Sequence, residues 1–132
     1  MKLNFIPFTL NENISEFKGQ IQFVETDNGV DLYGAINPLN EFLKGIPGLS
    51  INLYFYQDRL ITVYLNIDDS LKNQEKVIRI VEQALGRAKI FLNSQFQIKQ
   101  GWEDDNKVLY IIRDETLKKI YLYYSLREYS VI

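Results

Sequence analysis

The feature that most restricts the fold of this chain is a series of alternating apolar and polar residues interrupted by short polar turns. Asn28-Gly29 is a strong hairpin signal, because both residues tolerate positive φ. Similar turns are expected at Gln57–Arg59, at Asp104–Asn106 and at Glu115–Leu117. Strands joined by turns this short run antiparallel. The sequence therefore predicts a mainly antiparallel sheet built from hairpins.

Each hairpin has an expected register, because a slip of one residue would move every side chain of a strand to the opposite face. The registers that oppose apolar to apolar residues need a two-residue turn in the first hairpin and three-residue loops in the others. The expected pairs are Ile21 with Ile36 and Phe23 with Gly34, then Leu53 with Val63, Tyr54 with Thr62 and Asn52 with Tyr64, then Trp102 with Val108, Tyr110 with Leu122 and Val108 with Tyr124. Val30 and Leu32 are expected to continue the apolar face of Phe23.

One long amphipathic helix is expected after Asp69 or Ser70, either of which can cap its first turn. Apolar residues then recur at helical spacing as far as Ala88, and Gly86 is a suitable end. A short helix is expected from Pro38 to Gly45, and a helical turn within residues 11–18.

These elements indicate an α+β protein in which hairpins alternate with isolated helices. We expect a mainly antiparallel sheet of about six to seven strands, with the long helix packed on one face and one short helix elsewhere. At 132 residues, the chain is expected to form a single domain spanning residues 1–132.

The composition excludes the commonest catalytic chemistries. The chain has no cysteine and no histidine, so thiolate nucleophiles, histidine-dependent triads and histidine-ligated zinc are impossible. Its glycines and serines fit neither a phosphate loop nor a nucleophile elbow. A net charge of -2 argues against binding to nucleic acid. We therefore expect a protein that is not an enzyme, with no catalytic residue, no cofactor and no nucleic-acid partner.

The densest acidic cluster is Glu103-Asp104-Asp105-Asn106, and adjacent carboxylates can bind divalent cations. The cluster has no EF-hand spacing and falls at an expected hairpin tip. We interpret it as a solvated turn and expect no metal site.

The nine tyrosines fall in segments expected to be strands, and several occupy positions where a polar residue would normally face solvent. Tyrosine combines an apolar ring with a polar tip, which suits a surface that is covered only at times. The expected partner face consists of Tyr54, Tyr56, Tyr64, Tyr121 and Tyr123. Tyr121 and Tyr123 are expected to share it with Leu109 and Ile111. Alternatively, residues 3–8 cover these two tyrosines.

Two functions follow from these aromatic residues. The first is a protein-binding module, of an inhibitor or immunity type, that binds another protein or a second copy of itself. The segment from Tyr129 to Ile132 would then extend an exposed edge strand. The alternative is a carrier of a small apolar ligand, with a pocket between helix and sheet lined by Trp102, Tyr110 and Tyr124.

The segment from Leu49 to Leu126 resembles small bacterial α+β domains of unknown function, often found in exported proteins or lipoproteins. The matching features are Ile51-Asn52-Leu53-Tyr54-Phe55, Arg59-Leu60-Ile61, Ala84-Leu85-Gly86, Trp102-Glu103 and the strands Leu109–Ile112 and Ile120–Ser125. The resemblance implies an antiparallel sheet with a packed helix and carries no functional residues with it. An abundance of Ile, Asn and Lys also suggests a bacterial origin.

No segment of the sequence has the length and apolar character of a signal peptide or a membrane helix. This departs from the exported examples. We expect a cytoplasmic protein without membrane insertion, or an exported one if an upstream signal has been removed.

Overall fold

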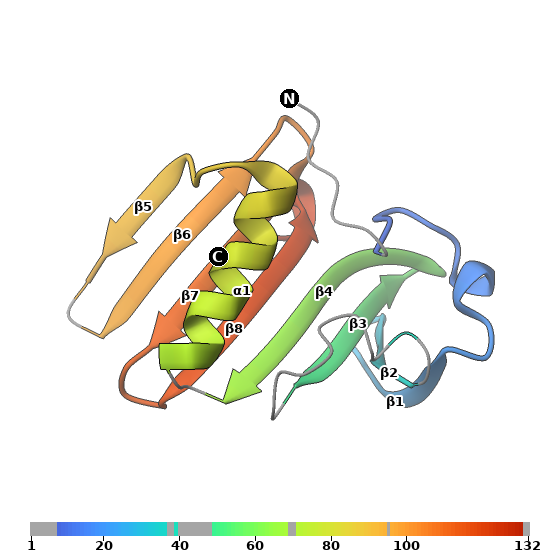
Figure 1. Cartoon of the computed structure of the whole chain (residues 1–132). Helices are drawn as coiled ribbons and strands as arrows, with labels where there is room; N and C mark the ends of the chain where they lie inside the picture. The colour runs from blue at the N-terminus through green and yellow to red at the C-terminus, as the bar shows by residue number, and fades with distance from the viewer. Residues whose placement is uncertain (1–7, 37–38, 40–48, 69–70, 95, 131–132) are drawn as a thin grey trace.

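The computed structural model describes residues 8–36, 39, 49–68, 71–94 and 96–130. Within these residues the chain forms one sheet of eight strands, one α-helix and two short 3-10 turns (Figure 1). The strands are β1 (Ile21–Asp27), β2 (Val30–Ala35), β3 (Ser50–Tyr56), β4 (Arg59–Asp68), β5 (Ile90–Asn93), β6 (Gln97–Glu103), β7 (Lys107–Asp114) and β8 (Lys119–Leu126). The helix is α1 (Leu71–Leu85), and the turns are η1 (Ile14–Phe17) and η3 (Arg127–Tyr129).

The sheet consists of two antiparallel meanders joined side by side. The strand order is β1-β2-β3-β4-β8-β7-β6-β5, so β4 and β8 form the junction and α1 links β4 to β5. The α+β class and the antiparallel sheet are confirmed. The sheet has eight strands and not six to seven, because residues 90–93 add an edge strand beside β6. The short helix expected from Pro38 to Gly45 lies outside the described residues, except for the buried Leu39.

The main hydrophobic core lies between α1 and one face of the sheet (Figure 1). Val77 and Val81 of α1 are buried against a cluster that includes Leu65, Leu109 and Leu122 from the central strands. The buried positions of α1 follow the helical spacing of apolar residues in the sequence. At the β1–β3 end, Phe8, Phe17 and Leu39 belong to the same cluster.

Helix α1 ends at Gly86, as the sequence predicts. Gly86 has φ +81° and its N–H donates to the carbonyl oxygen of Glu82 at 2.8 Å, a C-terminal turn that favours glycine. The indole Nε1 of Trp102 donates to the carbonyl oxygen of Gly86 at 3.0 Å. This bond fixes the end of α1 to β6, and Trp102 is fully buried.

The first two hairpins each contain a β-bulge that the sequence analysis did not anticipate. Around Asn28-Gly29, the expected two-residue turn forms, but a bulge at Val24 pairs Phe23 with Tyr33. Val30 and Leu32 therefore lie on the opposite face from Phe23.

In the second hairpin the loop has two residues, Gln57 and Asp58, both with positive φ. The prediction of three residues was wrong, yet a bulge at Ile61 restores the expected register. Tyr54 pairs with Thr62 as predicted.

The register of β7 differs by one residue from the expectation on both of its sides. Trp102 pairs with Leu109 and not with Val108, and Tyr110 pairs with Tyr123 and not with Leu122. Leu109 and Ile111 are consequently buried on the helix side. Trp102 and Tyr124 still share one face of the sheet, as expected. The register of β7 shifts by one residue in the same direction against both neighbours, so only the two faces of β7 are exchanged relative to the prediction.

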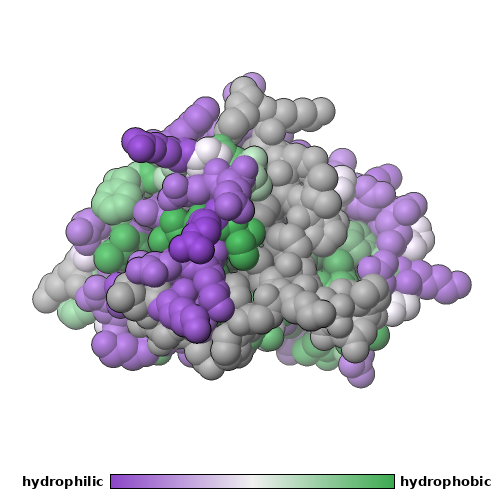
Figure 2. Space-filling model, viewed as in Figure 1, coloured by the Kyte–Doolittle hydropathy of each residue, from purple (hydrophilic) through white to green (hydrophobic). Residues whose placement is uncertain are grey.

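Both edges of the sheet expose apolar side chains. Phe23 and Val24 are exposed on β1, while Phe91 (62% exposed) and Leu92 (56% exposed) are exposed on β5. Figure 2 shows apolar atoms beside β5 on the helix side of the molecule. The C-terminal residues were expected to extend an edge strand. That expectation was wrong for Tyr129, because β8 lies inside the sheet and Tyr129 belongs to η3.

Candidate functional site

The sheet face opposite α1 carries most of the tyrosines. Directly paired residues of neighbouring strands share a face, so the pairings place six tyrosines together. One cross-strand row runs through Asn52, Tyr64, Tyr123, Tyr110 and Gly101. We call this surface the tyrosine face, and its members are Tyr54, Tyr56, Tyr64, Tyr110, Tyr121 and Tyr123. The five tyrosines predicted from the sequence thus lie on one face.

Three rings of the tyrosine face pack together around Tyr64. The ring centroid of Tyr64 lies 5.2 Å from that of Tyr121 and 6.1 Å from that of Tyr123, the second pair being nearly perpendicular. Tyr123 is only 4% exposed, whereas Tyr54, Tyr64 and Tyr121 are partly exposed. Tyr123 therefore forms the buried base of this surface, and Tyr54, Tyr64 and Tyr121 are accessible above it.

The alternative in which the N-terminal segment covers Tyr121 and Tyr123 is answered in part. Phe8 is fully buried in the core cluster on the helix side. Residues 3–7 lie outside the described residues. Leu109 and Ile111, expected beside these tyrosines, lie on the helix side, and Tyr110 and Ile112 take their places.

Tyr110 joins the tyrosine face because β7 is inverted, and Gly101 makes room for its ring. A Cβ at position 101 would lie 2.6 Å from Cε1 of Tyr110, closer than packed carbon atoms allow. An aromatic ring over a strand glycine fills the space that the missing side chain leaves. Only the correct register would have revealed this pair in the sequence.

A hollow of about 340 Å³ opens in the tyrosine face beside η3. Its lining residues are Val30, Tyr54, Ile61, Thr62, Tyr64, Tyr123 and Tyr129. Tyr129 reaches this position from η3, and its ring centroid lies 5.7 Å from that of Tyr56. Sequence reasoning missed Tyr129 as a site residue, since no strand periodicity extends past Leu126.

The hollow is walled by aromatic rings and flanked by carboxylates. Glu25 lies in one cross-strand row with Leu32 and Tyr54. Burial first, and then the charge of Glu25, raise the pKa of Tyr54. Loss of solvation and the adjacent Glu128 likewise raise the pKa of Tyr129.

Tyr64 has the most perturbed phenol of this face. Burial, followed by repulsion from the charge that Tyr121 and its neighbours would carry when ionised, raises the pKa of Tyr64 to about 12. Tyr54, Tyr64 and Tyr129 are consequently neutral at physiological pH and can donate hydrogen bonds.

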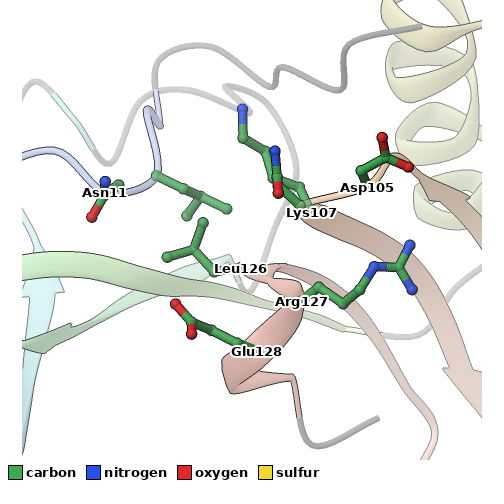
Figure 3. A pocket seen from close by; sticks show the side chains of 8 residues that line it. Asn11, Asp105, Lys107, Leu126, Arg127 and Glu128 are labelled. Carbon is green, nitrogen blue, oxygen red and sulfur yellow. The ribbon is translucent and has the colours of Figure 1, made fainter.

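A larger hollow, of about 640 Å³, lies on the other side of η3 (Figure 3). Figure 3 shows Leu126 between Asn11 and Lys107, with Arg127 and Glu128 following it along the chain. Arg127 forms an ion pair of 3.2 Å with Glu103 and donates to the carbonyl oxygen of Asp104. Its charge is thus partly neutralised within the protein.

A smaller hollow of about 160 Å³ shares lining residues with both of these hollows. The small hollow shares Leu126 and Glu128 with the large hollow, and Ile61 and Tyr129 with the tyrosine hollow. The three hollows therefore adjoin one another around η3. Sequence patterns do not predict this arrangement, because residues from five separate segments (10–11, 30, 54–64, 105–107 and 123–129) meet there.

The pocket expected between helix and sheet does not assemble from Trp102, Tyr110 and Tyr124. Trp102 and Tyr124 are fully buried in the core, whereas Tyr110 points from the opposite face of the sheet. The inverted register of β7 is the physical reason. The residues on which the carrier hypothesis depended are therefore not brought together.

The acidic cluster at 103–106 forms the tip of the β6–β7 hairpin. Oδ1 of Asp104 accepts hydrogen bonds from the backbone N–H groups of Asn106 and Lys107, both at 2.8 Å. Such bonds are typical of a polar turn. Within the described part of the chain, no group of three or more acidic side chains is placed to bind a metal ion. Nor does any described helix have the length and apolar character needed to cross a membrane.

Comparisons of the chain with protein-family models, with curated proteins and with solved structures give no match in any of the three. The interpretation of the site accordingly depends on its geometry and chemistry.

Proposed function

We propose that this protein is a non-enzymatic binding module that docks another protein on its tyrosine face. The observation that carries the proposal is the cluster of rings in which Tyr64 packs against Tyr121 and Tyr123 on the face opposite α1. At one end of this face Tyr129 of η3 lies against Tyr56, and Tyr54, Tyr64 and Tyr121 remain partly exposed. Partly exposed aromatic side chains grouped on one sheet face are typical of a protein-interaction surface.

The kind of side chain supports docking over simple core packing. Tyr54, Tyr64 and Tyr121 are partly exposed, and each has a hydroxyl that can bond with water or with a partner. Tyrosine is enriched among interface residues whose truncation costs most, on the order of 2 kcal/mol or more each. Two χ angles also leave little side-chain entropy to lose on binding.

The test compares partner retention by native mass spectrometry after incubation with extract from the source organism. We expect Tyr54→Ser, Tyr64→Ser and Tyr121→Ser each to weaken retention of a partner by tenfold or more, since one such anchor is worth on the order of 2 kcal/mol. Circular dichroism should show a folded sheet in all three.

Phe96→Ser provides a matched control, because Phe96 is an exposed aromatic residue between β5 and β6 that lies outside the tyrosine face. Equal losses in the control and in the tyrosine variants would indicate nonspecific adhesion and contradict the proposal. Unfolding of the tyrosine variants would show that these rings belong to the core.

A second candidate function is self-association through the edge strand β5. Among the described strands it pairs only with β6, and its Phe91 and Leu92 are largely exposed. An unprotected apolar edge favours pairing with another strand, and two β5 edges could pair antiparallel in a symmetric dimer. Light scattering after size-exclusion chromatography tests it: Leu92→Lys should convert a dimer to a monomer. A monomeric parent protein at high concentration would contradict this candidate.

A further inference from the structure

The hollow in the tyrosine face has an unusual combination of walls. The partly exposed rings of Tyr54, Tyr64 and Tyr129 surround it, and the buried ring of Tyr123 forms part of its floor. Val30, Ile61 and Thr62 complete the lining, so none of the charged side chains in the described ranges lines it. A volume of about 340 Å³ suits a single side chain of a partner and is too small for a folded element.

Negative charge flanks the hollow on two sides. Glu25 lies in the same cross-strand row as Tyr54, two strands away. Glu128 directly precedes Tyr129 and lines the adjoining hollow, which shares Ile61 and Tyr129 with this one. Both carboxylates are exposed and are available to a bound partner.

The positive charge beside the hollow belongs to Arg59, which lines the adjoining hollow together with Glu128. Its Nη1 donates to the carbonyl oxygen of Asn11 at 3.0 Å. No described lysine or arginine lines the tyrosine hollow itself.

We propose that this hollow binds a lysine or arginine side chain of the partner protein, with the cation against the tyrosine rings and near Glu25 and Glu128. The proposal rests on the docking function proposed above and names the chemistry of its central contact. The faces of aromatic rings attract cations, and partial exclusion of water strengthens that attraction. Two carboxylates add attraction for a cation and repel an anionic group. A neutral apolar side chain would gain only from the rings.

The first experiment titrates the protein with n-butylammonium and follows the ring signals of the tyrosines by NMR. The matched neutral probe is n-butanol, which has the same alkyl chain, and the anionic probe is pentanoate. We expect n-butylammonium to shift the signals of Tyr54, Tyr64 and Tyr129 with an affinity about fivefold higher than that of n-butanol. Pentanoate should produce no shift.

The carboxylates are tested by the double variant Glu25→Gln and Glu128→Gln. We expect it to lower the affinity for n-butylammonium about threefold or more and to leave n-butanol binding unchanged. Glu115→Gln is the matched control, because Glu115 is exposed in the β7–β8 turn and lies outside the hollow. Added salt should weaken n-butylammonium binding to the parent protein and have less effect on the double variant.

The outcomes separate this proposal from the docking function. Equal affinity for n-butylammonium and n-butanol, or no binding of either, would overturn the cation site. If Tyr54→Ser still abolished partner retention in that case, the docking function would stand without it. If cation binding were found but the tyrosine variants retained the partner fully, the hollow would bind cations and the docking function would fall.

Discussion

At the scale of single residues, Tyr64 connects the packing of the tyrosine face with its acid–base behaviour. Burial raises the pKa of Tyr64 from 10.0 to about 12. A group whose pKa is raised on folding binds its proton more tightly in the folded state. Its contribution to stability is complete below pH 10 and is lost as the pH rises to about 12.

This difference predicts a loss of stability in the alkaline range. We expect the free energy of unfolding to fall between pH 10 and about 12, with one tyrosine ionising later than the others. Tyrosinate absorbance and chemical denaturation across this range measure both effects. Tyr64→Phe should remove the late ionisation and reduce the fall, and an unchanged titration curve in that variant would contradict the assignment.

Gly101 and Tyr110 form the second residue-scale test. Because a Cβ at position 101 would lie 2.6 Å from the Tyr110 ring, Gly101→Ala should displace that ring and cost about 1–3 kcal/mol of stability. In a Tyr110→Ala background the same substitution should cost much less. Denaturation of the four proteins of this cycle measures the coupling, and strictly additive costs would show that the ring does not restrict position 101.

At the scale of elements, one hydrogen bond links α1 to the sheet. Trp102→Phe keeps most of the buried ring but removes the donor to the Gly86 carbonyl oxygen at the helix end. We expect a loss of about 1–3 kcal/mol, because the substitution removes one hydrogen bond and part of a fully buried ring. Urea denaturation followed by circular dichroism measures it. Unaltered stability would mean that water replaces the indole at this position.

The elements also show which parts of the fold follow from sequence. The turn at Asn28-Gly29 and the helix α1 were both predicted, because glycine positions and helical spacing are local signals. The bulges at Val24 and Ile61 were not, since a bulge depends on contacts with the neighbouring strand.

The two faces of strand β7 were exchanged in the prediction for a different reason. Leu109 and Ile111 alternate with Tyr110 and Ile112, so both faces of the strand are apolar. A register slip then exchanges one apolar face for another, and the hydrophobic pattern cannot distinguish the two. The tyrosine face was predicted in outline, yet its link to Tyr110 and the hollow beside Tyr129 required the three-dimensional arrangement.

At the scale of the whole molecule, the β4–β8 junction decides whether the two meanders behave as one unit. Leu65 of β4 pairs with Leu122 of β8, and both side chains are fully buried on the sheet face that α1 covers. Thr62 and Ser125 pair on the opposite face, where their hydroxyls lie 2.8 Å apart. The junction is therefore packed on both faces, which favours a single cooperative domain.

A substitution at this junction tests the expectation of one domain. Leu122→Ala should lower the free energy of unfolding by about 2–5 kcal/mol, because it leaves a cavity in the core. Fluorescence of Trp102 reports on the β5–β8 meander, and amide exchange of β2 and β3 reports on the other. If the protein is one cooperative unit, the unfolding transitions reported by both probes must move to the same lower denaturant concentration. This is because neither meander can unfold without the other. If the fluorescence transition moved while exchange in β2 and β3 did not, the meanders would be separate folding units. The tyrosine face, which crosses the junction through Tyr64 and Tyr123, would then depend on how the two units dock.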